Sequence, residues 1–143
     1  MVREGIYDVG NFTAGDFTAG DFTAGDRGFA AIKRSIRERE QAAKVALMQE
    51  TVARAWNVPI GELRSPTRRR APVAQARQVA MYLTHVIYGF SLSAVGRHFG
   101  RDRTTAAHAC RLVEDRRDDE SFDMLLDRLE HALRRAGERG RQQ

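Results

Sequence analysis

The chain has 143 residues and a mass of 16.1 kDa, which is the size of one ordinary domain with short additional segments. Charged residues make up 30% of the chain and hydrophobic residues 42%, a balance that suits a soluble helical domain. The sequence has no apolar run long enough to span a membrane, no signal-peptide pattern and only one cysteine, Cys110, which excludes an internal disulfide. We therefore expect a cytoplasmic protein.

The motif Phe-Thr-Ala-Gly-Asp occurs three times in succession, over residues 12–26. A period of five matches neither a helix nor a strand, and units this short cannot stack into a solenoid core. We interpret residues 1–28 as a disordered arm. The alternative is that Phe12, Phe17 and Phe22 anchor a protein partner.

The composition changes after this arm to strong helix formers. Residues 29–56 contain no Gly or Pro and are rich in Ala, Arg, Glu and Gln. Only the second half is amphipathic, and its apolar face at steps of three and four consists of Val45, Met48, Val52 and Ala55 with Trp56. We expect a helical lead-in at 29–44 and a folded domain at 45–136.

The rest of this domain also has helical patterns. Pro59 begins a short helix, a longer one runs after Pro72 to Tyr88, and two more flank Gly100. The inner face expected for the longer helix consists of Val73, Ala76, Val79, Ala80, Leu83, Val86 and Ile87. A last amphipathic helix leads into a tail, residues 137–143, that we expect to fray. Its inward face consists of Phe122, Leu125, Leu126, Leu129 and Leu133. Together these patterns predict an all-α domain of about five to six helices.

Positive charge is concentrated in the middle of the chain. Residues 64–111 contain nine basic residues and a single acidic one, Asp102, whereas the stretches on either side are nearly balanced. All but two of the 24 basic residues of the chain are arginines, the side chain best suited to phosphate and guanine. A basic footprint on one structural unit is typical of a nucleic-acid-binding face.

Residues 91–117 have the layout of a helix-turn-helix. A first helix ends at Gly100, and Asp102 is placed to cap the second by accepting from a backbone N–H of Thr104 or Thr105. Val95 and Phe99 would pack against the second helix, whose first turn would enter the major groove. The face left outward then carries Arg103, Thr104, Ala107 and His108.

Residues 100–110 read Gly-Arg-Asp-Arg-Thr-Thr-Ala-Ala-His-Ala-Cys. This segment resembles the signature of the C-terminal DNA-binding domain of the bacterial chromosomal replication initiator DnaA, and the resemblance extends from about residue 47 to residue 133. It implies a Trp-repressor-like helix-turn-helix fold and binding of double-stranded DNA at a DnaA-box-like site.

The resemblance also implies roles for individual residues. Asp102, Arg103 and Thr104 would read bases in the major groove. The DNA backbone would be bound by Arg68, Arg69, Arg70, Arg77, Arg97, Arg101, Thr105 and His108. Two positions depart from the family: Arg103 stands where a His is usual, and Gln75 stands where an Arg reads the minor groove. Since Arg favours guanine, we expect a preferred site that differs from the initiator's.

The sequence contains no phosphate-binding loop of the type Gly-x-x-x-x-Gly-Lys-Ser/Thr. We therefore expect a DnaA-like domain that stands alone, without the AAA+ ATPase, and that binds no nucleotide. We also expect no enzymatic activity and no cofactor, and His108 with Cys110 is too small a set for a metal site.

The favoured function is transcription regulation by occupancy of DNA sites, with the protein in the nucleoid as a monomer or weak dimer. The alternatives are a replication modulator that competes for initiator boxes and a helical protein-interaction module.

Overall fold

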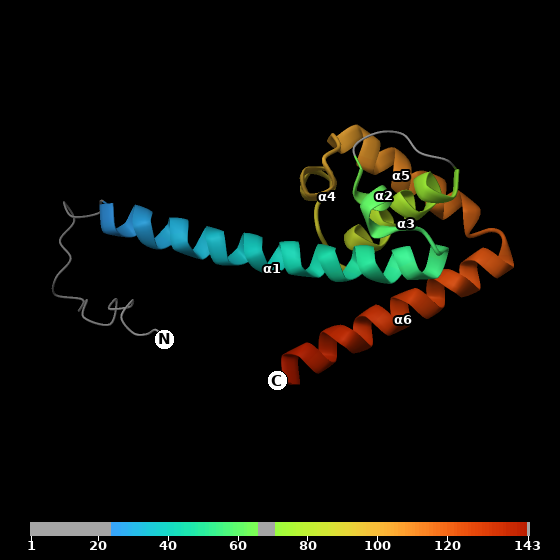
Figure 1. The fold of residues 1–143 in the computed structure, drawn as a ribbon. Coiled ribbons are helices and arrows are strands. Elements are labelled where there is room, and N and C mark those ends of the chain that lie inside the picture. Colours follow the sequence, from blue (N-terminus) through green and yellow to red (C-terminus); the bar gives the residue numbers. More distant parts are fainter. Residues whose placement is uncertain (1–23, 66–70, 143) are drawn as a thin grey trace. The chain divides into compact units, whose positions relative to one another are not determined.

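The computed structural model describes residues 24–65 and 71–142, and within these ranges it contains six helices and no strand (Figure 1). The helices are α1 (Ala24–Trp56), α2 (Ile60–Arg64), α3 (Ala71–Tyr88), α4 (Leu92–Phe99), α5 (Arg103–Arg116) and α6 (Glu120–Gln142). The prediction of an all-α protein is confirmed. The chain divides into two compact units, and the division falls inside α1, between Glu40 and Gln41.

Helix α1 begins at Ala24, earlier than the composition predicts, so residues 24–28 of the expected arm are helical. Asp26 lies in the first turn, where a carboxylate suits the positive end of the helix dipole. The good helix formers that follow offset the cost of two glycines. Phe12, Phe17 and Phe22 lie outside the described residues.

The hydrophobic core lies in the second unit, and α3 is its central helix. Helix α3 packs against α2, α4, α5 and α6, and all of its apolar residues from Val73 to Leu83 are buried except Ala74, which is half-buried. The inward face predicted for α6 is also confirmed. Its buried residues are Phe122, Leu126, Leu129 and Leu133.

The buried face of α1 differs slightly from the predicted one. Met48 and Val52 are fully buried as expected, but Ala53 is buried in place of Ala55. Gln49, one turn before Ala53 on the same side of the helix, is also buried, and its amide oxygen accepts a hydrogen bond from Arg64 of α2 at 2.8 Å.

Two further features concern the helix ends. Val86, expected on the inner face of α3, is 41% exposed, whereas its neighbours Ile87 and Tyr88 pack against the core. Helix α6 continues past Gly137 to Gln142, through the segment that we expected to fray. No helix among the described residues is long and apolar enough to cross a membrane.

The junction between α5 and α6 is held by Arg117, which the sequence analysis did not single out. Its guanidinium forms ion pairs with Asp123, Asp127 and Glu130 of α6 and donates to the Tyr82 hydroxyl of α3. Burial opposes the charge, but these hydrogen bonds prevail and raise the pKa of Arg117. One arginine therefore ties the end of α5 to two neighbouring helices.

Candidate nucleic-acid interface

Helices α4 and α5 form the predicted helix-turn-helix, and both ends of α4 are capped. The Ser91 hydroxyl accepts from the backbone N–H of Ala94 at 3.1 Å. At the other end Gly100 adopts a left-handed conformation with φ of 66°. The N–H of Gly100 donates to the carbonyl of Arg97, and the N–H of Arg101 donates to that of Gly96. This paired arrangement ends the helix and begins the turn.

Gly96 allows the turn to lie directly against α4. A Cβ atom at this position would lie 2.6 Å from the carbonyl oxygen of Arg101 and 3.1 Å from the carbonyl carbon of Asp102. Both are backbone atoms, which cannot rotate away. The close contact between α4 and the turn therefore requires glycine, for steric reasons and not for its backbone freedom.

Asp102 caps α5, as the sequence predicts. Its Oδ1 accepts from the backbone N–H of Thr105 at 2.7 Å, and its backbone has the extended conformation of an N-cap residue. The backbone hydrogen bond from Thr105, with a second one from its side chain, lowers the pKa of Asp102. The carboxylate is fully exposed, so it fixes the first turn of α5 while it faces solvent.

The inner face of α5 packs as expected. Ala106 and Ala109 form a small core with Val95 of α4, with Phe99 packed against it. Cys110 and Val113 belong to the larger core around α3. Burial raises the pKa of the Cys110 thiol to about 11, in keeping with the predicted role of a small core residue.

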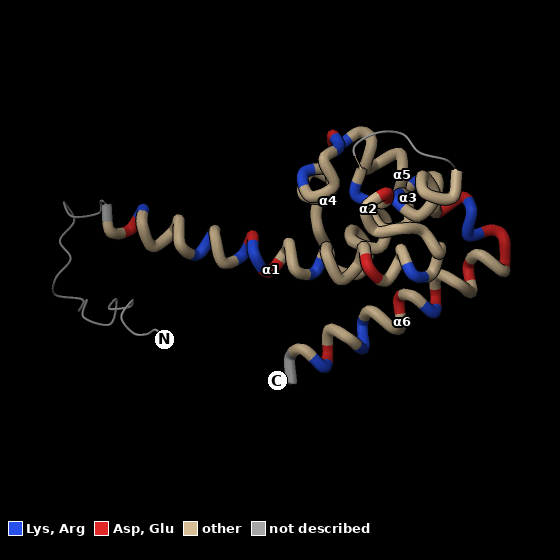
Figure 2. The backbone as a smooth tube through the Cα atoms, in the orientation of Figure 1, with Lys and Arg blue, Asp and Glu red and all other residues tan. Residues whose placement is uncertain are grey.

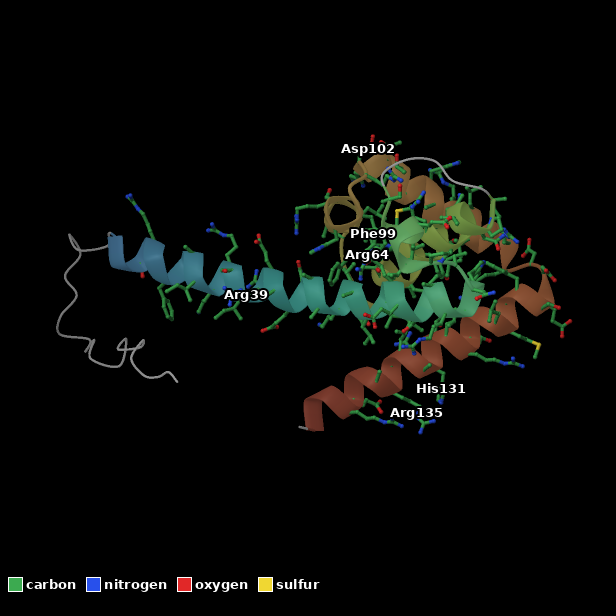
Figure 3. The ribbon with its side chains drawn as sticks, viewed as in Figure 1. Arg39, Arg64, Phe99, Asp102, His131 and Arg135 are labelled. Carbon is green, nitrogen blue, oxygen red and sulfur yellow. The ribbon has the colours of Figure 1, made fainter. Side chains whose placement is uncertain are left out.

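The outer face of α5 carries the polar residues predicted to contact DNA. Arg103, Thr104, Thr105 and His108 are all exposed, and so is Arg97 on α4. Figure 2 shows basic residues where α4 meets α5. In Figure 3 Asp102 stands at this end of the domain, away from His131 and Arg135 of α6. The first turn of α5 is thus an exposed, polar and structurally fixed surface.

Arg101 is half-buried and is not free of partners, so only part of its side chain faces solvent. Arg68, Arg69 and Arg70 lie outside the described residues, and their contacts with the DNA backbone stay a prediction.

Arg77 requires a correction, because it is an internal residue. It is only 7% exposed, its Nε donates to the carbonyl of Leu63 at 3.1 Å, and its Nη2 donates to that of Glu62 at 3.1 Å. These carbonyls lie in the last turn of α2, where the carbonyl of Glu62 also accepts from the backbone N–H of Ser65. Arg77 therefore fixes α2 against the start of α3, and we remove it from the phosphate-binding set.

Gln75, at the position of the family's minor-groove arginine, is also used inside the domain. Its amide oxygen accepts from the indole N–H of Trp56 at 2.7 Å. Trp56 contacts the ring of Phe122 edge to face, with centroids 6.5 Å apart. Trp56 is therefore a packing residue, as the sequence predicts, and Gln75 links it to α3.

Two histidines outside α5, His85 and His98, are packing residues. The carbonyl of Phe90 accepts from Nδ1 of His85 at 2.7 Å, and the ring of His98 packs on that of Phe90. The described part of the chain contains no group of three or more His, Cys, Asp or Glu side chains that could hold a metal ion.

Comparisons with known proteins agree with this geometry. Residues 45–113 match the family described as the bacterial DnaA protein helix-turn-helix. The chromosomal replication initiator DnaA of Mesorhizobium japonicum is 49% identical over 69 residues, which are 48% of this chain and 14% of that protein. DnaA of Caldanaerobacter subterraneus is 30% identical over 105 residues, which are 73% of this chain and 24% of that protein.

Two solved structures resemble this one. A crystal structure of a DNA replication initiation factor gives a TM-score of 0.64 at 33% identity, over 74% of this chain and 32% of that one. The structure of replication initiator DnaA bound to AMPPCP and single-stranded DNA gives a TM-score of 0.62 at 32% identity, over 73% of this chain and 31% of that one.

This chain thus spans about a quarter or less of the length of these curated initiators. The matching part is the DNA-binding helix-turn-helix and not an enzymatic domain. The family match, the fold and the capped α4–α5 unit agree, and residues 45–113 are therefore a DnaA-type helix-turn-helix DNA-binding domain.

Proposed function

We propose that this chain binds double-stranded DNA in a sequence-specific way and acts as a small transcriptional regulator that occupies DnaA-box-like sites. The first turn of α5 is the observation that carries the proposal. Its polar side chains are exposed, its backbone is fixed by Asp102, and its opposite face is buried in the core. A helix that is held in this way presents side chains to the major groove at a defined height and angle.

Base reading falls to Asp102, Arg103 and Thr104. Arg103 is exposed at the first position of α5, from which a guanidinium can donate to O6 and N7 of a guanine. Ala107, one turn further on, is small enough to let the helix approach the bases closely. The proposed readers therefore occupy the tip of α5, and the site should contain a guanine opposite Arg103.

Contacts with the DNA backbone hold the domain in register. Arg97, Thr105 and His108 are exposed around the tip of α5, and Arg101 with the basic segment 68–70 completes the set. If about five phosphates are neutralised, log K falls with log salt at a slope of about −4 to −5. A slope of this size would agree with a compact basic surface around one helix.

Fluorescence anisotropy with a preferred duplex and a random duplex tests the role of Arg103. Arg103→Ala should cost ~1–3 kcal/mol on the preferred duplex and little on random DNA. Arg135→Ala is the matched control, because Arg135 is an exposed arginine of α6 on another side of the domain (Figure 3). Equal loss on both duplexes would show that Arg103 contacts phosphate and reads no base.

A replication modulator that competes for initiator boxes is the second candidate function. The similarity to initiators within the DNA-binding domain supports it, whereas Arg103 and Gln75 favour an altered site. Binding to an authentic initiator box distinguishes the two candidates. Arg103→His restores the family's usual residue, and it should shift the preference of the protein toward that box.

A further inference from the structure

The first unit carries an apolar stripe that is exposed among the residues of this unit that the structure describes, 24–40. Phe29, Ile32 and Ile36 of α1 are 44%, 56% and 50% exposed, and their spacing of three and four places them on one face of the helix. The surrounding residues, 25–40, are all exposed. Scattered apolar residues on a surface need no explanation, but a contiguous stripe indicates a contact surface.

We propose that a second copy of this chain covers this stripe, in an antiparallel pair of α1 helices. The twofold axis would pass at the level between Ala30 and Ala31. Phe29 then lies at the level of Ile32 of the second copy, and Ile36 lies at the level of Gly25 of the second copy. A Cβ at Gly25 would meet no atom within 4 Å, so the isoleucine has room. The stripe repeats in steps of three and four, as in a two-helix coiled coil.

Charge complementarity selects this occupant and this orientation. Asp26 and Lys33 are seven residues apart, so they lie two turns apart along the same edge of the stripe. In the antiparallel pair Asp26 approaches Lys33 of the second copy, and the symmetry produces this ion pair twice. Within one helix the two residues are about 10 Å apart along the axis, too far for them to pair with each other.

The position of Lys33 agrees with this arrangement. Its ammonium lies 4.9 Å from the centre of the Phe29 ring, so the charge is held at the border of the stripe. The opposite edge carries Gly28 and Ser35, which have no charge. A parallel pair would bring the charged edge of one copy against this uncharged edge of the other and would form no such ion pairs.

The consequence for DNA binding rests on the proposed function. A dimer carries two helix-turn-helix units, so binding of the first to DNA raises the effective concentration of the second. Paired sites would then be bound more tightly than single ones. Self-association can be measured without DNA. A protein that stays monomeric would therefore contradict the dimer and leave the proposed function untouched.

Sedimentation equilibrium of the full chain tests the association. The expected mass rises with concentration from 16.1 kDa toward twice that value. Ile32→Glu should weaken the dimer at least tenfold because it places a carboxylate in the stripe. Met124→Glu is the matched control, since Met124 is 48% exposed on α6, and it should leave the association unchanged. A constant mass of 16.1 kDa, or equal effects of both variants, would overturn the proposal.

Charge exchange tests the orientation. Asp26→Lys and Lys33→Asp should each dimerise at least tenfold more weakly, because each places like charges opposite one another. An equimolar mixture of the two variants restores opposite charges in both pairs and should form a heterodimer as stable as the wild-type dimer. A mixture that stays monomeric would overturn the antiparallel register. Far-ultraviolet circular dichroism verifies that each variant keeps its helix.

A membrane surface is the competing occupant, since α1 also carries several arginines. Flotation with vesicles of phosphatidylglycerol and phosphatidylcholine separates the two occupants. If the wild type binds vesicles, Ile32→Glu does not, and the protein is monomeric in solution, then a lipid surface covers the stripe and the proposal is wrong. Dimerisation without vesicle binding supports it.

Discussion

The replacement of Gly96 by alanine is the most informative perturbation of the helix-turn-helix. The new Cβ would lie 2.6 Å from the carbonyl oxygen of Arg101, so α4 and the turn must separate by roughly 0.5–1 Å to restore ordinary van der Waals contact. Overpacking of this kind costs up to about 3 kcal/mol. Alanine is favoured over glycine inside a helix by about 1 kcal/mol, so the net loss of stability is about 2 kcal/mol.

Chemical denaturation followed by circular dichroism measures this loss. Gly137→Ala in α6 is the control, because a Cβ there would meet no atom within 4 Å, and its stability should be unchanged or slightly raised. A domain of ordinary stability that loses about 2 kcal/mol remains almost entirely folded. Any accompanying loss of DNA affinity by Gly96→Ala therefore reports the displaced turn and not unfolding. Equal stability of the two alanine variants would refute the steric role of Gly96.

Three further predictions concern single side chains. Asp102→Asn should keep the helix cap, since asparagine caps as well as aspartate, but change sequence preference; Asp102→Ala should also lower the melting temperature. Because the folded-state pKa of Asp102 is lowered, its stabilising effect is present above the unfolded pKa and is lost as pH falls through the folded one. Carbon-13 titration of the carboxyl group should therefore give a midpoint below the ordinary value, and an ordinary midpoint would contradict the cap. Arg117→Ala should lower the free energy of unfolding by about 2 kcal/mol, a value reduced to allow for the partial exposure of the ion pairs. The control is Arg128→Ala, which removes an exposed arginine of α6. If both variants lose equally little stability in chemical denaturation, Arg117 does not hold the junction. Cys110, whose pKa is raised to about 11, should react with a thiol reagent at pH 8 only after unfolding, and rapid reaction of the native protein would show that it is not in the core.

The fold was largely predictable from the sequence because local signals agree with one another. The apolar spacing in α3 and α6, and the cap at Asp102, each match the element that the structure contains. The structure differs from the prediction where a contact with another helix determines which side chain is buried. Gln49 is buried because Arg64 of another helix binds it, and no local pattern in α1 indicates that partner.

In the candidate site, too, the features set by local spacing were predictable and those set by tertiary contacts were not. The exposure of Arg103 and Thr104 follows from helical spacing, but the burial of Arg77 does not, because the carbonyls that it binds belong to the end of α2. A family resemblance assigns a residue to a surface without testing whether that surface is accessible. The role of Arg117 did leave a signal, since Asp123, Asp127 and Glu130 lie at steps of four and three on one face of α6.

The close contact at Gly96 was not predictable from spacing. Glycine inside a short helix usually indicates a helix end or a weak helix, and here α4 ends three residues later, at Phe99. Only the three-dimensional path of the turn shows that the carbonyl of Arg101 occupies the space of a side chain.

In-vitro selection from a random duplex pool at about 0.15 M salt, an ionic strength at which exposed charges are partly screened, tests base reading by α5 most directly. Arg103→Ala and Arg135→Ala are selected in parallel. We expect one compact motif for the wild type and for Arg135→Ala, with a guanine preference that disappears at a single position in Arg103→Ala. Absence of any enriched motif, together with binding that salt abolishes, would contradict sequence-specific recognition by this helix.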